Sequence, residues 1–142
     1  MDEATINKAA PPASTAKAST KGRNQPPIPG EHILNSLADP LLLVDSSDRI
    51  RFVNLSAEAF FAAGANVLRR QGLSDVVPFD SPLLSLVNQV RKRGHSIAEY
   101  GLIVATPRIG AHHVDVQITP VPEEPSYLVV TLRERGIASK ID

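Results

Sequence analysis

The stretch LLLVDSSDRIRFVN, residues 41–54, decides the fold of this chain. Its first part is a compact apolar run, its last part alternates between apolar and charged side chains, and a polar Ser-Ser-Asp turn lies between them. Two short strands joined by such a turn form a β-hairpin. Ile50 and Phe52 are expected on one face of the second strand. Asn54 is a good helix N-cap, because its side-chain oxygen can accept an amide proton that the first turn leaves free.

Short helices are predicted after this hairpin. Ala57, Phe60 and Phe61 give the first one a buried stripe, and Gly64 can end it. Single turns are expected at 66–70 and 73–77, where packing must stabilise pieces too short to nucleate alone.

The longest helix is predicted from Ser81 to Gly94. Ser81 caps it, Pro82 occupies the first turn, and Gly94 stops it. The basic side chains at 91–93 complement the negative end of the helix dipole.

Three further strands are expected at 97–105, 112–120 and 127–133. The middle one alternates cleanly, with Val114, Val116 and Ile118 on one face. The order is therefore two strands, several helices and three strands. Short loops and one apolar face per strand predict an α+β fold, an antiparallel sheet with its helices on one side.

The two ends of the chain differ from this central region. Residues 1–30 are rich in Pro, Ala, Ser, Thr and Lys, which predicts a disordered leader. A short helix is expected at 31–38, ended by Asp39-Pro40. Ile137 and Ile141 lie four residues apart, so residues 136–142 are interpreted as the first turn of a linker helix.

Composition excludes several classes of function. Fifteen basic and fifteen acidic residues balance, and no concentrated basic run indicates nucleic-acid binding. The chain has no cysteine, which rules out thiolate chemistry and cysteinyl-flavin photochemistry. No apolar run approaches the roughly 20 residues that span a bilayer, so a cytoplasmic protein is expected.

Several segments resemble the PAS family, in the order in which that family has them. They are residues 33–45, 49–54 and 57–61, followed by the long helix and the three closing strands. Residues 31–135 are therefore interpreted as a PAS sensor domain, for which the resemblance implies a five-stranded antiparallel sheet. The loop sequences at 77–84, 99–101, 106–110 and 133–135 are similar to those of the NtrB-type nitrogen-regulation sensor histidine kinases.

This second resemblance implies a function. NtrB-type kinases are cytoplasmic and dimeric, phosphorylate a response regulator that controls nitrogen assimilation, and receive a PII signal protein. The phosphoaccepting His motif and a Gly-rich ATP-binding segment are absent from this sequence. The chain is thus expected to be a sensing and dimerisation module without enzymatic activity, cut off before the kinase region. The alternative is a ligand- or cofactor-binding PAS module of another kinase or of a transcription regulator.

Candidate site residues fall into three groups. The first is a homodimer helix with Ile33, Leu34 and Leu37. The second comprises aromatic residues that line a pocket or belong to the core, Phe52, Phe60, Phe61 and Tyr100. The third, an output-coupling segment, contains Arg133, Glu134, Arg135, Ile137 and Ile141. Glu134 and Gly136 occupy the places of Asp and Thr in the Asp-Ile-Thr signature that ends many PAS domains.

No catalytic, metal or cofactor site is predicted. His113 and Asp115 share a strand face, but no third ligand or nucleophile is near them in the sequence. His95 follows Gly94 in what should be an exposed turn, so neither haem nor flavin is expected.

Overall fold

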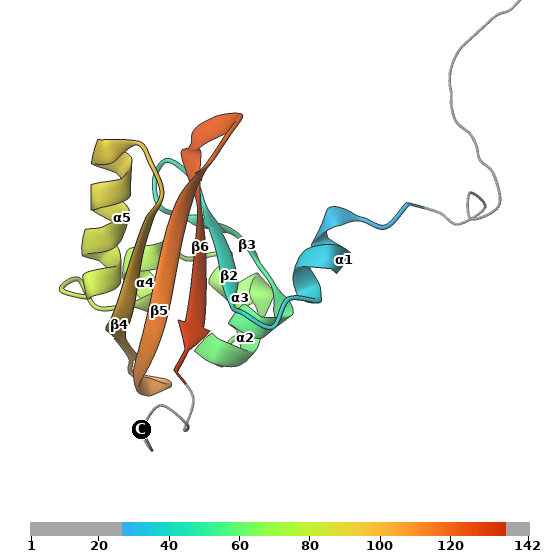
Figure 1. Cartoon of the computed structure of the whole chain (residues 1–142). Helices are drawn as coiled ribbons and strands as arrows, with labels where there is room; N and C mark the ends of the chain where they lie inside the picture. The colour runs from blue at the N-terminus through green and yellow to red at the C-terminus, as the bar shows by residue number, and fades with distance from the viewer. Residues whose placement is uncertain (1–26, 136–142) are drawn as a thin grey trace, which may run out of the picture. The chain divides into compact units, whose positions relative to one another are not determined.

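The predicted hairpin forms the start of the sheet. β2 (Leu41–Val44) and β3 (Ile50–Val53) pair antiparallel across the polar turn. The structure, a computed structural model, describes residues 27–135 (Figure 1). The expected leader, apart from its last four residues, and the expected linker helix at 136–142 lie outside the described residues.

Three long strands complete the sheet. They are β4 (Ile97–Thr106), β5 (Gly110–Val121) and β6 (Glu124–Glu134). The five strands lie in the order β3-β2-β6-β5-β4, with every neighbouring pair antiparallel. The last strand therefore occupies the middle of the sheet, between the first strand and β5 (Figure 1). The predicted fold class is confirmed.

Helices α2 to α5 supply the second layer. Their bounds are α2 Leu55–Phe61, α3 Ala65–Leu68, α4 Leu73–Val76 and α5 Pro82–Arg93. The longest, α5, begins and ends as its sequence predicts: the Ser81 hydroxyl accepts the amide proton of Leu83, and Gly94 adopts a φ of 77°. A positive φ carries little steric cost only for glycine, which explains why α5 ends at this residue.

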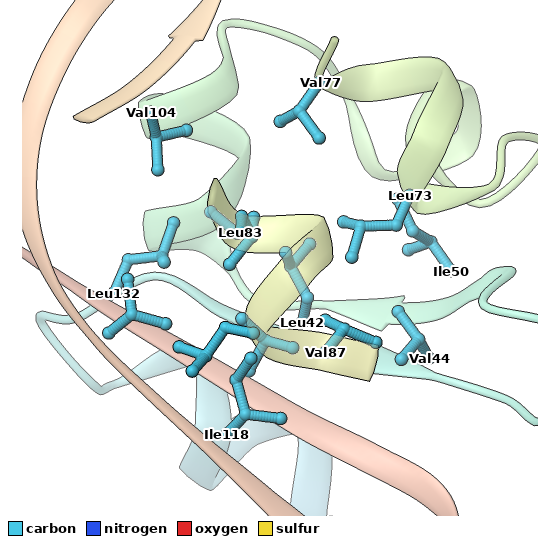
Figure 2. Packing of buried hydrophobic residues seen from close by; sticks show 14 of the residues in the cluster. Leu42, Val44, Ile50, Leu73, Val77, Leu83, Val87, Val104, Ile118 and Leu132 are labelled. Carbon is cyan, nitrogen blue, oxygen red and sulfur yellow. The ribbon is translucent and has the colours of Figure 1, made fainter. Parts of the chain in front are cut away.

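The hydrophobic core lies between these helices and one face of the sheet (Figure 2). Leu83 and Val87 of α5 lie in one buried cluster with Ile118 of β5 and Leu132 of β6. The alternating face predicted for β5 is buried. Each residue of the cluster is at most 9% exposed, so burial of apolar area on this one face stabilises both layers.

Asn54 connects the first strands to the helices. Its Oδ1 accepts the amide protons of Leu41 and Ala57, each at 2.9 Å, and its Nδ2 donates to the carbonyls of Leu34 and Asp39, each at 3.0 Å. The residue is 0% exposed. The predicted N-cap of α2 is confirmed, and the same side chain also holds the chain that precedes β2.

The N-terminal helix α1 (Gly30–Asn35) is shorter than the expected 31–38. Ser36 and Leu37 turn back instead, with amides that donate to carbonyls three residues earlier. Two side chains fix this turn to α2: Asn35 Oδ1 accepts the amide proton of Leu55 at 2.9 Å, and the Ser56 hydroxyl donates to the Leu37 carbonyl at 2.6 Å.

Arg91 has a more specific role than dipole complementation. From the last turn of α5 its guanidinium donates to Asp48 Oδ1 and to the carbonyls of Asp45 and Ser126. These acceptors lie near the β2–β3 and β5–β6 turns. One side chain thus ties the helix layer to two turns of the sheet.

The end of α2 differs from the prediction. The cap is Ala62 in the left-handed region (φ 52°, ψ 43°), and Gly64 instead precedes α3 as its N-cap. The earlier stop lets the chain turn directly into α3. For alanine this conformation costs about 1 kcal/mol, because Cβ crowds the carbonyl that follows.

Substitution of Asn54 should destabilise the domain strongly. In Asn54→Ala four side-chain hydrogen bonds are lost, and the buried Leu41 amide is left without its acceptor, so we expect the free energy of unfolding to fall by about 3 kcal/mol. Urea unfolding followed by circular dichroism measures this. The control is Asn88→Ala on the exposed face of α5, expected to change stability by less than about 0.5 kcal/mol. Equal effects of the two substitutions would contradict the role of Asn54.

Substitution of Ala62 by glycine should instead stabilise the domain. Ala62→Gly removes the crowded Cβ, which outweighs the greater entropy of the unfolded chain, and we expect a gain of about 0.5 kcal/mol in urea unfolding. The exposed Ala59, inside α2, serves as the control, since glycine there should cost about 1 kcal/mol. A loss of stability at both positions would contradict the assignment of the cap.

Candidate functional site

The end of β6 carries three consecutive charged residues, and each pairs with a different part of the domain. Arg133 Nη2 lies 3.1 Å from Asp39 Oδ2, in the segment before β2. Glu134 pairs with His112 near the start of β5. Arg135 Nε lies 3.0 Å from Asp115 Oδ1, farther along β5. The last described residues of the chain are thus held by three side-chain pairs, which we call the exit pairs, and the second is an ion pair only when His112 is protonated.

The exit pairs are distributed over both faces of the sheet. Glu134 pairs in register with the buried Val114, so it lies on the face of the sheet that α2 to α5 cover, the helix-covered face. Arg133 pairs in register with Asp115 on the opposite face, which α2 to α5 leave uncovered and which we call the helix-free face. Arg135 returns to the helix-free face, since strand side chains alternate. There, Asp39, Arg133, Asp115 and Arg135 form a row of alternating charge.

Asp115 is shared between this row and a bulge in β4. Glu99 pairs with Val116 and Leu102 with Val114, so Tyr100 and Gly101 together oppose Asp115. The Gly101 amide donates to Asp115 Oδ1 at 2.9 Å. This hydrogen bond, followed by the one from Arg135, lowers the pKa of the Asp115 carboxyl below 3.8. Asp115 therefore links the irregular part of β4 to the end of β6.

The prediction for Tyr100 is also corrected. Tyr100 lies three residues after Ile97, whose register partner Ile118 is buried, so its side chain lies on the helix-free face, 74% exposed. The extra residue Gly101, with a φ of 73°, then returns Leu102 to the core face. It is not part of the core. It borders a shallow depression of about 220 Å³ on that face, together with Asp39, Asp115 and Arg133.

The second pair, His112 with Glu134, lies at the edge of the core. His112 Nδ1 contacts Glu134 Oε2, and Nε2 lies 3.0 Å from the Ile109 carbonyl. The ring stands edge-on to Phe60 of α2, with centroids 5.3 Å apart. The hydrogen bond that His112 donates to Glu134 is the main cause that raises the pKa of His112 above 6.5, against partial desolvation.

The other aromatic residues divide between core and surface. Phe60 and Phe61 belong to the core, with ring centroids 4.9 Å apart in an edge-to-face arrangement. Alternation predicted that Phe52 shares a face with Ile50, and this prediction was wrong. β3 has a register shift, because Leu43 pairs with Phe52 but Val44 with Ile50. Arg51 is the extra residue, so Phe52 lies half-buried on the helix-free face.

The expected dimer helix lies at the surface. Ile33 and Leu37 are 56% and 43% exposed, Leu34 is half-buried, and α1 contains no buried residue. Ile137 and Ile141 of the predicted output segment lie outside the described residues. Two residues of the exit pairs, Asp39 and His112, were not predicted, since 94 and 22 positions separate them from their partners.

Comparison with known proteins agrees with this architecture. Residues 30–135 match the family model of the PAS fold, so the chain belongs to the PAS family. Within the described part of the chain, no helix is long and apolar enough to cross a membrane.

Two curated relatives show which kind of PAS protein this chain resembles. The chain is 40% identical over 118 residues to the sensory histidine kinase/phosphatase NtrB of Azospirillum brasilense, covering 83% of this chain and 30% of that protein. It is 42% identical over 111 residues to NtrB of Rhizobium meliloti, covering 78% and 29%. The chain thus spans about 30% of the length of these curated relatives.

A solved structure supports the same assignment. The crystal structure of the PAS domain of nitrogen regulation protein NR(II) from Vibrio parahaemolyticus superposes with a TM-score of 0.64 at 25% identity. It covers 74% of this chain and 96% of that one. The PAS domain is therefore similar in sequence and in structure to those of nitrogen-regulation kinases.

Removal of the Asp115 carboxylate should loosen the bulge. In Asp115→Ala the Gly101 amide loses its acceptor, so we expect its hydrogen exchange to accelerate severalfold, with little change at amides inside the core strands. Exchange followed by NMR measures this. Gln117→Ala, two residues along the same exposed face, is the matched control. Unchanged exchange at Gly101 in Asp115→Ala would refute the link.

Proposed function

We propose that residues 31–135 are the sensing and dimerisation module of a cytoplasmic two-component sensor histidine kinase that controls nitrogen assimilation. The observation that carries this proposal is the 40–42% identity to NtrB proteins over about four fifths of the chain. In the full-length protein, the kinase region would autophosphorylate and act on a response regulator, and a PII signal protein would report the nitrogen status. The PAS module would itself catalyse nothing.

The proposed mechanism uses packing changes in place of chemistry. A signal that favours one arrangement of helices, sheet and partner subunit shifts the population toward that arrangement. β6 lies in the centre of the sheet and ends at the exit pairs. A change in the sheet would therefore reach the following chain through Arg133, Glu134 and Arg135.

Homodimerisation is proposed through α1 and the helix-free face. The hydrogen bonds of Asn54, Asn35 and Ser56 fix the end of α1, and its apolar side chains remain exposed. The helix-free face also carries half-buried apolar residues, among them Leu43 and Phe52. A second copy of the chain would cover both surfaces.

We further propose that sensing requires no resident cofactor. What supports this is the filling of the helix-covered face, where side chains from the sheet and from α2 to α5 pack into one continuous apolar cluster (Figure 2). An absorbance scan and native mass spectrometry of the purified chain test the point. A visible chromophore or a stoichiometric small molecule would favour a ligand-binding PAS module instead.

A domain exchange tests the assigned function. The corresponding region of Azospirillum brasilense NtrB is replaced by residues 31–135, and a nitrogen-controlled reporter is measured with and without ammonium. We expect nitrogen-dependent expression close to that of the parent kinase, and its loss in an exchange that carries Asn54→Ala. Expression that ignores nitrogen with the unmodified domain would contradict the proposal, provided that the chimaera accumulates normally.

Charges on α1 should prevent dimerisation. We expect the 142-residue chain to be a dimer at tens of micromolar in light scattering, and the double variant Ile33→Glu/Leu37→Glu to be a monomer, since burial of two carboxylates in an apolar interface is costly. Val67→Glu is the control, because Val67 is 46% exposed on α3, away from the proposed interface. A monomeric parent chain would refute the dimer.

A further inference from the structure

The His112–Glu134 pair differs chemically from the other two exit pairs. Arg133 and Arg135 hold their charge at every physiological pH, whereas an imidazole gains or loses a proton between about pH 5 and 8. Glu134 lies at the end of β6, and the next residue, Arg135, donates its amide proton to the His113 carbonyl at 3.0 Å as the last described backbone bond between β6 and β5. One titratable contact, between His112 and Glu134, therefore lies where the chain leaves the sheet at the end of β6.

With Glu134 ionised, the geometry around His112 favours the form of the ring that carries two protons. Both of its nitrogens face acceptors, a Glu134 carboxylate oxygen and the Ile109 carbonyl. Neutral imidazole carries one N–H, so one of the two contacts would then set a lone pair against an oxygen. The imidazolium satisfies both and adds the attraction of the carboxylate.

The surroundings of His112 contain few competing charges among the described residues. β6 contributes Glu134, α2 contributes the uncharged Phe60, and β4 contributes Val104 as the register partner. Arg108, in the β4–β5 turn, directs its guanidinium to the Ala62 carbonyl. Arg133 and Arg135, which flank Glu134, are paired with Asp39 and Asp115.

We propose that His112 and Glu134 form a proton-dependent latch on the end of β6. The latch is closed while the ring carries both protons and opens when it loses one. It is a property of the domain itself, and its use as a signal to a kinase rests on the proposed function.

The direction in which the stability of the latch depends on pH follows from the raised pKa of His112. Because the folded-state pKa of His112 is raised above 6.5, the latch contributes its full stabilisation below pH 6.5 and loses it as the pH rises through the folded-state pKa. The end of β6 is therefore held below pH 6.5 and released as the pH rises through the folded-state pKa of His112.

NMR titration of the 142-residue chain tests the latch. The ring signals of His112 should titrate with a midpoint above 6.5, and Glu134→Gln should lower that midpoint. His113→Gln, at the neighbouring exposed histidine, should leave it unchanged. In the same samples, the protection factor of the Arg135 amide should fall severalfold as the pH crosses the His112 midpoint, whereas in His112→Gln it should not depend on pH.

Two outcomes would overturn the latch. One is a His112 midpoint that Glu134→Gln does not move, and the other is an Arg135 protection factor with the same pH dependence in His112→Gln as in the parent chain. Glu134→Gln leaves the ring of His112 in place, so it decides the matter if His112→Gln folds poorly. Neither measurement involves a kinase, so failure of the latch and failure of the proposed function are separate results.

Discussion

The Asn54 side-chain amide is the constraint on which the arrangement of the first half of the domain depends. A primary amide offers two acceptor lone pairs and two donor protons, and all four are used within the protein interior. Because an unpaired polar group is expensive to bury, this side chain fixes three backbone segments together: the end of α1, the start of β2 and the first turn of α2. Asn54 thus joins the hairpin to the first helix of the helix layer.

Features that depend on local sequence were predictable. The β2–β3 hairpin, the caps of α5 and the buried face of β5 follow from residues within one turn or one strand. Two bulges were not. An extra residue at Arg51 places Phe52 on the face opposite to Ile50, and another at Gly101 places Tyr100 on the face opposite to Leu102. Phe52 and Tyr100 therefore both lie away from the core. Strict alternation carries no signal for where a strand inserts a residue, although a glycine inside a strand is a weak one.

Of the exit pairs, the residues at the end of β6 were predictable from local sequence, whereas the pairing with their partners was not. Arg133, Glu134 and Arg135 stand out because they follow the last apolar alternation and because of the family resemblance. Their partners come from the segment before β2 and from two positions of β5, and only the order of strands in the sheet brings them together. His113 and Asp115 were expected to share a strand face, and no site was predicted there. In the structure Asp115 instead contacts Arg135 and Gly101, and the neighbouring His112 contacts Glu134.

The distribution of the exit pairs over two faces bears on how a central strand can transmit a change. Each pair is partly exposed, and pairs of this kind contribute at most about 1 kcal/mol each in water. The core below them buries a continuous apolar cluster, so the strand itself should resist displacement more strongly than its last residues. A twist of the outgoing chain would strain the Glu134 contact on one face and the arginine contacts on the other. Small free-energy differences are then enough to select between arrangements, which is the property that a sensor domain needs.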